Sequence, residues 1–371
     1  MAKPACIPHD LPLFDLDWQG LLPRVGRGNA ALARYDGMLQ TLPDPSVLLS
    51  PITVNEAVLS SRIEGTQATL DEVLGHDAGL AAPESRRGDI EEITNYRVAV
   101  RIAEEELAER PLSLSLIKSI HQRLMQGVRG RDKSPGEFRR DQNWIGRQGD
   151  TMERARFIPP SPMILPQCLE QWAAYLQNQD EDPILQTAVA HAQFEILHPF
   201  KDGNGRIGRM LIPLLLYQRR ALSRPMFYLS EYLEAHRDTY YDRLLAITER
   251  NDWQGWLEFF IDALVVQAED NLAKVIQIRD LHAHMRARFV EVTHSQYAHG
   301  AVDAFFASPV ISATNFYARA GYNTRVTANN MLRQLETAGL IARVRDGSGP
   351  MPAIYAMPEL INIAEGRAVL R

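Results

Sequence analysis

HPFKDGNGRIGR, residues 198–209, leads directly into the apolar run MLIPLLLY and gathers several reactive residue types in one turn. Gly203 and Gly205 permit backbone angles that other residues rarely adopt. Successive N–H groups in such a turn form a concave nest for anions, and the positive end of the following helix dipole strengthens it. Arg206 and Arg209 are three residues apart and share a face of that helix. The turn is therefore predicted to bind a phosphate chain.

Two further side chains in this stretch suit the transfer of a phosphate-containing group. Asp202 offers a hard oxygen ligand of the kind that holds Mg²⁺ against phosphates. His198 has the side chain best suited to taking up a proton near neutral pH. The combination predicts a phosphoryl- or nucleotidyl-transfer site. It is neither a P-loop nor a Rossmann site, because GxxxxGK[ST] is absent and no GxGxxG follows a predicted strand.

Each of these residues also has an ordinary structural explanation. A glycine-rich loop before an apolar helix is usually only a turn, and a histidine at a helix end is usually a cap or a core residue. A zinc site is a second chemical alternative, because His191, Glu195 and His198 share one helix face over two turns. The HExxH order is absent and no cysteine is near, so His191 is predicted to be a core or supporting residue.

Length and composition indicate a water-soluble globular protein of two or three domains. The chain has 371 residues, of which 45% are hydrophobic and 23% charged. A net charge of −6 argues against a general basic surface for nucleic acid or membrane. Cys6 and Cys168 are the only cysteines, which favours a reducing, cytoplasmic setting. No signal peptide is visible at the N-terminus, and the apolar runs are too short to span a bilayer.

The hydrophobic periodicity predicts a mainly α-helical fold with two small hairpins. Ser50-Pro51 is expected to start a helix that ends near Gly65. A polar turn between residues 143–146 and 155–158 predicts a short hairpin closed by two prolines. The other predicted helices span residues 28–42, 66–74, 90–108, 113–128, 184–197, 206–220, 230–247, 252–270 and 264–290.

The C-terminal region has the pattern helix, turn, helix and two-stranded wing, which predicts a winged helix-turn-helix. Residues 295–371 contain seven arginines and no lysine against five acidic residues. This mild positive excess permits phosphate contacts but does not require them. DNA binding and protein docking therefore both stay open for this region. The arginines concerned are Arg319, Arg325, Arg333, Arg343 and Arg345.

Residues 198–209 resemble the Fic motif HPFx[DE]GNGRxxR and fit it at every fixed position. Three neighbouring stretches are also similar to Fic proteins, namely GEFRRDQNWIG, RFIPPSP and YLSEYLEAHRDTYYDRLL. The resemblance covers about residues 50–265, and a C-terminal winged helix is common in longer members. It implies an N-terminal region with an inhibitory helix, a Fic-type helical core with a hairpin flap, a connector helix and a winged-helix domain. The expected ranges are 1–95 (inhibitory helix 51–65), 96–262, 263–292 and 293–371.

The resemblance implies AMPylation, the transfer of AMP from ATP to a protein hydroxyl with release of pyrophosphate. His198 would deprotonate a target Ser, Thr or Tyr, and Asp202 would hold Mg²⁺. Arg209 would pair with the γ-phosphate. Related kinases of the Doc type have a lysine where this chain has Gly205, which argues for AMP transfer over phosphate transfer. The expected nucleotide-binding residues are Lys201, Asp202, Gly203, Asn204, Gly205, Arg206, Arg209, Tyr240 and Tyr241.

The resemblance also implies a docking flap and a built-in brake. Residues 154–160 are similar to the hairpin that pairs with the target chain as an added strand, with Arg156, Phe157 and Ile158 as docking residues. A plain surface hairpin is the alternative. Ser60, Glu64 and Gly65 resemble the inhibitory motif [ST]xxxE[GN], in which the glutamate pairs with the second motif arginine, here Arg209. The alternative is a glutamate that simply precedes a capping glycine.

Two other functions stay open at this point. The same site could remove AMP, because the equivalent glutamate supports de-AMPylation in some relatives. The chain could instead be a transcription regulator that senses nucleotides and binds DNA through the winged helix. The resemblance further suggests a homodimer, and a target that includes the chain itself.

Overall fold

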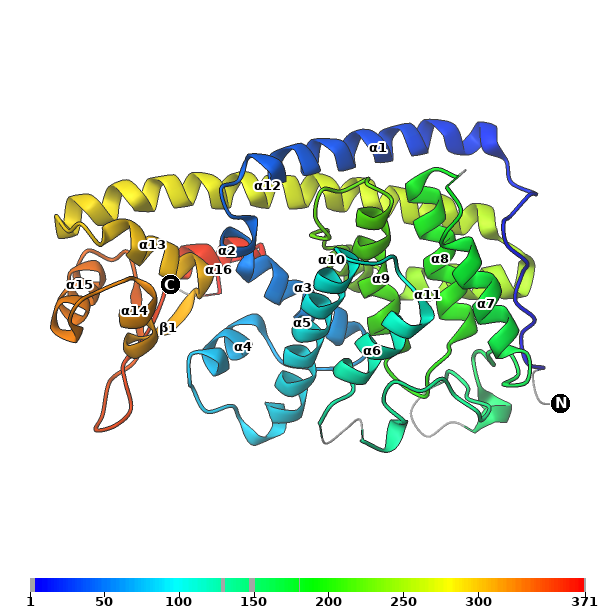
Figure 1. Cartoon of the computed structure of the whole chain (residues 1–371), viewed down its shortest axis with the longest axis horizontal. Helices are drawn as coiled ribbons and strands as arrows, with labels where there is room; N and C mark the ends of the chain where they lie inside the picture. Colours follow the sequence, from blue (N-terminus) through cyan, green and yellow to red (C-terminus); the bar gives the residue numbers. More distant parts are fainter. Residues whose placement is uncertain (1–3, 128–130, 147–150, 180, 370–371) are drawn as a thin grey trace. The chain divides into compact units, whose positions relative to one another are not determined.

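The computed structural model describes residues 4–127, 131–146, 151–179 and 181–369, which divide into two compact units (Figure 1). The first unit comprises Met1–Asp36, Leu59–Gly65 and Glu91–Glu269. The second comprises Gly37–Val58, Thr66–Ile90 and Asp270–Arg371. The finer domain boundaries expected from the sequence stay a prediction.

The first unit is helical and holds the stretch 198–209. Four of its helices, α1, α3, α5 and α12, also have residues in the second unit. The helices are α1 (Trp18–Thr41), α3 (Ser50–Ile63), α5 (Arg87–Leu107), α6 (Leu114–Leu124), α7 (Leu165–Tyr175), α8 (Pro183–Leu197), α9 (Asn204–Gln218), α10 (Ser230–Ala235), α11 (Arg237–Arg250) and α12 (Trp253–Thr293).

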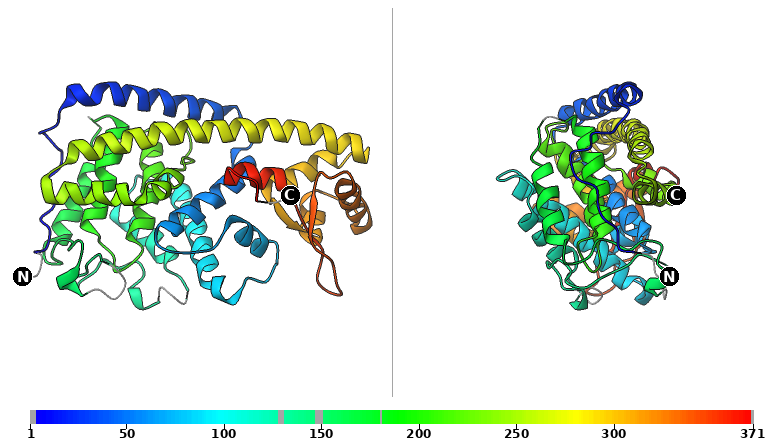
Figure 2. Two further views of the ribbon diagram at one scale, coloured as in Figure 1. Left: turned by 180° about the vertical axis from the view of Figure 1, so that it is seen from behind. Right: turned by 90° about the vertical axis from the view of Figure 1, so that its right-hand side faces the viewer.

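Helix α8 is the buried centre of this unit, and α7, α9 and α11 pack against it (Figures 1 and 2). Asp182 begins the helix by accepting hydrogen bonds from two backbone N–H groups, and Pro183 occupies the first helical position. Two buried tryptophans donate indole N–H groups to carbonyls of α8: Trp172 to Ala190 (2.9 Å) and Trp256 to Ala188 (3.0 Å). The helix is therefore fixed on two sides, which gives the turn that follows it a rigid support.

The turn between α8 and α9 is set by its backbone angles. His198 ends α8 in the left-handed region (φ 46°), and Pro199 prevents the helix from continuing. Gly203 precedes α9 with a φ of 77°, where a side chain would be strained and a Cβ would lie 2.9 Å from Sδ of Met125. Helix α9 then continues through Pro213.

The expected hairpin is present as a single antiparallel bridge between Ile145 and Phe157. The N–H of Ile145 donates to the carbonyl of Phe157 (2.9 Å), and the N–H of Arg156 donates to the carbonyl of Ile145 (2.8 Å). A short 3₁₀ helix, Met152–Arg154, precedes the second arm. Residues 147–150 between the arms lie outside the described ranges.

The second unit combines short helices with a small antiparallel sheet in the order β1-β3-β2. Ala356 of β3 pairs with Val310 of β1 and with Ala342 of β2, so β3 is the central strand. The order of α14, α15, β2 and β3 follows the sequence-based expectation, while the winged-helix assignment stays a prediction. The elements are α2 (Pro45–Leu48), α4 (Leu70–Asp77), α13 (Ala298–Ala307), β1 (Val310–Ser312), α14 (Ala313–Arg319), α15 (Arg325–Thr337), β2 (Ala342–Arg345), β3 (Ile354–Ala356) and α16 (Pro358–Glu365).

Several helix boundaries differ from the prediction. Residues Trp253–Thr293 form one helix, α12, where two overlapping helices over 252–270 and 264–290 were predicted. Residues 230–250 form two helices, because His236 leaves the helical region between α10 and α11. Ser50 is the first residue of α3 and not its cap. Within the described ranges, no helix combines the length and apolarity needed to cross a bilayer.

Candidate functional site

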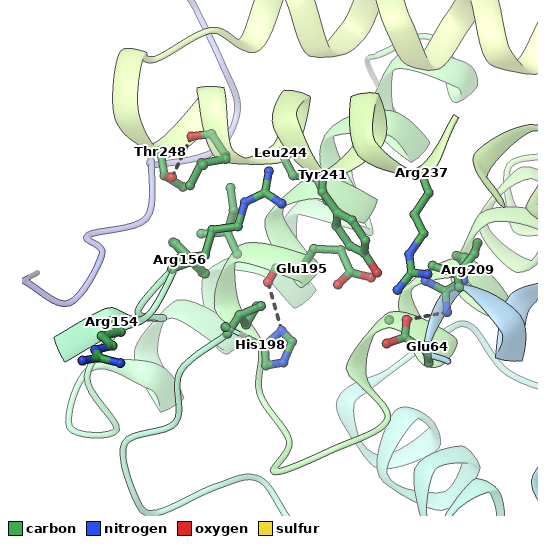
Figure 3. Close-up of a pocket in the computed structure, with 17 residues that line it drawn as sticks. Glu64, Arg154, Arg156, Glu195, His198, Arg209, Arg237, Tyr241, Leu244 and Thr248 are labelled. Carbon is green, nitrogen blue, oxygen red and sulfur yellow. Dashed lines mark hydrogen bonds and ion pairs between the residues drawn. The ribbon is translucent and has the colours of Figure 1, made fainter. Parts of the chain in front are cut away.

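A cavity of about 680 Å³ in the first unit brings together residues from α8, α9, α11, the end of α3 and the flap (Figure 3). His198 lies at its centre in this view, with Glu64 and Arg209 on one side and the flap arginines Arg154 and Arg156 on the other. Gly205 also lines it. Most of the predicted site residues are therefore in this cavity or in the turn beside it.

His198 is held with its imidazole in the neutral form. Its Nδ1 lies 3.4 Å from the carbonyl oxygen of Glu195, one turn earlier on α8. Burial lowers the pKa of His198 to about 4, and Arg139 contributes to the shift. The ring is thus unprotonated at neutral pH, and Nε2 is the nitrogen that can accept a proton.

The side chain of Asn204 stabilises the turn from within. Its Oδ1 accepts from the N–H of Phe200 (2.8 Å) and its Nδ2 donates to the Phe200 carbonyl (2.9 Å). The Oδ1 of Asp202 accepts from the N–H of Gly203 (2.6 Å). Lys201 is exposed and lies 3.4 Å from Asp141. Asn204 can therefore bind an anion through its backbone N–H, since its side chain is hydrogen-bonded to the backbone of Phe200.

Arg206 is buried and is not among the residues that line the cavity. Its guanidinium donates to Glu92 of α5 (2.9 Å) and lies 3.6 Å from Asp202. Its Nε has no hydrogen-bond partner among the described residues. Arg206 is therefore a buried positive charge next to the turn, and its carboxylate partners hold it in place.

Arg209 is fully paired on one edge by residues of α3. Its Nε donates to the hydroxyl of Ser60 (3.0 Å), and its Nη2 donates to the Ser60 carbonyl (2.8 Å) and to Oε1 of Glu64 (2.7 Å). The side chain of Arg209 is 1% exposed and that of Glu64 35%. Nη1 has no partner among the residues that the structure describes. Gly65, with a φ of 105°, follows the end of the helix.

The Glu64 carboxylate occupies the space directly above Gly205. A Cβ at position 205 would lie 2.2 Å from Oε1 of Glu64. Although burial opposes ionisation, Arg209, with help from Arg206 and His198, holds the pKa of Glu64 below its usual value. Glu64 is thus an anion placed against the first turn of α9 and its arginine.

The two neighbouring tyrosines of α11 have different positions. Tyr241 lines the cavity beneath Arg237, whose guanidinium lies 5.9 Å from the ring centroid. Tyr240 is buried away from the lining, and its hydroxyl lies 3.0 Å from Nε2 of His191. His191 Nδ1 lies 2.9 Å from the carbonyl of Gly208, so both ring nitrogens are in hydrogen bonds. His191 is a core residue, as predicted.

No group of three or more His, Cys, Asp or Glu side chains within the described ranges is placed to hold a metal ion. The zinc alternative thus has no support from these residues, since His191 is turned into hydrogen bonds with the core. Mg²⁺ has other requirements, because it commonly binds one or two carboxylates together with substrate phosphates. Asp202 fits that pattern: its Oδ1 accepts the Gly203 N–H, which leaves Oδ2 as a ligand beside the nest.

The flap meets α11 and the N-terminal segment. Arg156 forms an ion pair with Asp242 of α11, and both Arg156 and Phe157 line the cavity. Ile158 is buried, and its carbonyl accepts from the N–H of Cys6 (2.9 Å). The three expected docking residues therefore lie along one arm beside His198, with Ile158 at its inner end.

Two buried residues that the motif reading did not single out organise this turn. Arg139 donates to the carbonyls of His198 (2.9 Å), Pro160 (2.6 Å) and Leu197 (3.3 Å). His121 accepts from Gly136 (2.9 Å) and lies 3.0 Å from the Asp202 carbonyl. In the sequence, only the family-like stretch that contains GEFRR pointed to Arg139. Nothing pointed to His121, because a lone histidine on an amphipathic helix predicts no function.

The chain matches known protein families over most of the first unit. Residues 22–105 match the Fic/DOC family N-terminal region, and residues 111–216 match the Fic/DOC family. A probable protein adenylyltransferase of Aquifex aeolicus is 26% identical over 51% of this chain and 56% of that protein. The protein adenylyltransferase Fic of Aedes aegypti is 32% identical over 41% of this chain and 27% of that protein. The matches thus span 56% and 27% of the lengths of these two curated relatives.

Solved structures of Fic proteins share the fold. A Fic family protein from Desulfovibrio desulfuricans superposes over 90% of this chain and 96% of its own, with a TM-score of 0.60 at 19% identity. Fic-1 from C. elegans superposes over 71% of this chain and 75% of its own, with a TM-score of 0.56 at 19% identity. Together with the matched regions and the complete turn motif, this mainly helical fold has one assignment. The chain belongs to the Fic/DOC family.

Proposed function

We propose that this chain is a protein adenylyltransferase that transfers AMP from ATP to a Ser, Thr or Tyr hydroxyl of a target protein. The observation that supports this most is the meeting of His198, Gly205 and Arg209 in one cavity beside the flap. The matched relatives named protein adenylyltransferase agree with it. The simplest assay uses the chain itself as the target protein.

His198 is the proposed general base. Its neutral Nε2 accepts the proton of the target hydroxyl while that oxygen attacks the α-phosphorus of ATP. The bond from the α-phosphorus to the bridging oxygen breaks, and pyrophosphate leaves with that bonding pair. Arg139 supports this step by holding the carbonyl of His198 and thereby the left-handed turn that presents the ring.

The turn and the helix that follows it form the proposed phosphate site. A Cβ on Gly205 would lie 2.9 Å from Nη1 of Arg209, and Gly205 lies in the first turn of α9, where backbone N–H groups have no partner within the helix. Asp202 is the proposed ligand for Mg²⁺, which when bound neutralises charge on the phosphates. Gly205 is needed at this position because a side chain would intrude where the phosphates pass.

Glu64 is proposed to act as the brake on this site. Its carboxylate places negative charge over Gly205 and engages Nη2 of Arg209, the group that the γ-phosphate would need. An anion and the γ-phosphate repel each other there, so ATP is expected to bind in an unproductive position. Removing Glu64 frees a buried arginine for the phosphate, at the cost of leaving that charge unpaired without ATP.

Intact-mass measurement after incubation with ATP and Mg²⁺ tests the proposal. Wild type, Glu64→Gly and the double variant Glu64→Gly/His198→Ala would be compared. We expect an added AMP on Glu64→Gly, at least tenfold less on wild type and none on the double variant. The tenfold difference corresponds to about 1.4 kcal/mol, less than the loss of a charged hydrogen bond.

Glu64→Gln is the matched control, because it keeps the shape of the side chain and removes its charge. Labelling between those of wild type and Glu64→Gly is expected from it. An added phosphate in place of AMP would move the chain to the kinases, and equal labelling of wild type and Glu64→Gly would refute the brake. De-AMPylation would appear as loss of AMP from the labelled Glu64→Gly protein when it is incubated with the wild-type enzyme.

A further inference from the structure

Glu195 is a carboxyl group in the cavity to which the proposed chemistry assigns no task. It lies on α8, one turn before His198, and lines the cavity between His198 and Tyr241 (Figure 3). Its Oε1 is buried and has no hydrogen-bond partner among the described residues. A Cβ on Gly208 would lie 2.1 Å from this oxygen, so the carboxyl rests where only a glycine leaves room for it.

A buried carboxyl oxygen without a partner has a free-energy cost that an apolar side chain at position 195 would avoid. Burial also raises the pKa of Glu195 to about 8, which shows how poorly its surroundings stabilise the charge. Arg209 and Glu64 face the group from α9 and from the end of α3, and their opposite charges act on it in opposite directions. A ligand that supplies a hydrogen-bond donor would remove this cost.

The position of Glu195 on α8 determines which part of ATP can supply that hydrogen-bond donor. The phosphates carry no donor near neutral pH, so only the ribose hydroxyls and the base amino group remain. His198 must reach the oxygen that attacks the α-phosphorus, and residues three apart on a helix are about 5–6 Å from each other. The ribose is bonded to the α-phosphate through O5′, whereas the base is one ring farther away.

The far wall of the cavity leaves a suitable place for the base. Tyr241, Leu244 and Leu245 of α11 give it an aromatic and apolar surface. With the phosphates at Gly205 and Arg209, a base against this surface places the ribose beside Glu195.

We propose that the carboxyl of Glu195 accepts a hydrogen bond from a ribose hydroxyl of the bound nucleotide and thereby selects ribonucleotides. This rests on the proposed function for the site and adds a residue that reads the sugar. Asp and Glu carboxylates accept hydrogen bonds from ribose hydroxyls in dinucleotide-binding folds, and the carbonyl oxygen of a neutral carboxyl group accepts such a bond as well. A loss of the hydroxyl would return Oε1 to its unpaired state, so discrimination of about tenfold is expected.

The test is the dissociation constant of ATP, 2′-deoxy-ATP and 3′-deoxy-ATP, measured by calorimetry on the full chain carrying Glu64→Gly. At least one deoxy nucleotide is expected to bind about tenfold more weakly than ATP. Adding Glu195→Ala should reduce that ratio to about one, while Glu195→Gln, whose amide oxygen still accepts, should keep most of it. A merely structural defect would weaken all three nucleotides equally and leave the ratio unchanged.

Glu170→Ala, an exposed carboxylate on α7, is the matched control and should keep the full ratio. Equal affinity for all three nucleotides before mutation, or an unchanged ratio in Glu195→Ala, would overturn the ribose contact. Failure of ATP to bind at all would instead overturn the proposed function. Ribose discrimination without any AMP adduct would leave the contact in place and remove only the transfer reaction.

Discussion

Glu64 and Glu195 are two carboxyl groups in one cavity whose pKa values are shifted in opposite directions. Arg209 holds the pKa of Glu64 below its usual value, while burial raises the pKa of Glu195 to about 8. At neutral pH Glu64 is therefore an anion paired with an arginine, and Glu195 is largely a neutral acid, whose carbonyl oxygen still accepts a hydrogen bond. A single arginine cannot stabilise both charges, and the geometry commits it to Glu64 through a 2.7 Å contact.

The raised pKa of Glu195 predicts a pH-dependent effect on stability. A carboxyl whose folded pKa lies above its ordinary value of 4.5 stabilises the fold fully below that value. This contribution disappears as the pH rises through about 8, because the unfolded chain ionises freely and the folded one does not. Glu195→Gln should therefore be more stable than wild type at pH 8, by on the order of 1–3 kcal/mol, and nearly equal at pH 5.

Thermal unfolding of both proteins at the two pH values checks this. Arg209, Glu64 and the tyrosines of α11 are present in both, so their own titration largely cancels in the difference. A difference in Tm that is the same at pH 5 and pH 8 would show that Glu195 is ionised in the folded protein.

Among structural elements, the turn after α8 and the flap are coupled through one buried guanidinium. Arg139 donates to Leu197 and His198 at the end of α8 and to Pro160 at the end of the flap. It has carbonyl acceptors where a carboxylate partner would be usual, and burial lowers its pKa to about 10. With the carbonyl of Asp141 (3.3 Å), Arg139 has four divergent carbonyl acceptors, which suits the fork of an arginine, whereas an ammonium is a point donor. His198 and the flap are therefore positioned by the same residue, Arg139.

Arg139→Lys should reduce AMP transfer by about tenfold or more while leaving ATP affinity within about twofold, since the phosphate nest lies elsewhere on the turn. Labelling rate and calorimetric affinity, both in the Glu64→Gly background, separate the two effects. Arg140→Lys is the matched control, because the next residue is exposed and should tolerate the change. Equal losses of affinity and rate in Arg139→Lys would instead mean general damage to the site.

Individual elements were predictable to different degrees. Helix α8 follows the prediction closely, because Asp182-Pro183 begins it and Pro199 ends it. Helix α7 was missed, although Pro166 stands in its first turn and the buried residues Leu165, Leu169, Trp172 and Tyr175 follow a helical spacing. The break at His236 was missed as well, because no glycine or proline marks it. The ends of α8 could be predicted because a capping aspartate and two prolines mark them in the sequence. The boundary between α10 and α11 depends on tertiary packing and could not be predicted.

At the scale of the whole molecule, the site combines residues that no local pattern connects. Glu64 and Arg209 are 145 positions apart, and their pairing was expected only through the family resemblance. Tyr240 and Tyr241 are adjacent residues of the same type, so the sequence does not distinguish them, yet only Tyr241 lines the cavity. The motif at residues 198–209 was readable because its chemistry is contiguous. The burial of Glu195 against Gly208 depends on how two helices pack, which the sequence does not state.

Charge along the whole chain bears on the proposed winged helix. The region 295–371 has a small positive excess, whereas the complete chain has a net charge of −6. Four of its seven arginines have hydrogen-bond or ion-pair partners among the described residues: Arg343 pairs with Glu336 and Asp346, and Arg345 donates to the carbonyls of Gly79 and Pro352. Arg319 donates to the hydroxyl of Ser308, and Arg367 pairs with Glu365. Few cations thus remain for phosphates, which favours weak, non-specific contact with DNA.

We expect the full chain to bind a duplex only at low salt, with a dissociation constant above about 10 μM at physiological salt. About two phosphate contacts would give a slope near −2 for the logarithm of affinity against the logarithm of salt concentration. Arg325→Ala and Arg333→Ala, both on α15, should each reduce that slope by about one, and Arg101→Ala on α5 should not. Tight binding with a steep slope that survives both α15 variants would contradict this, and would favour a nucleotide-sensing regulator over an enzyme whose second unit docks protein.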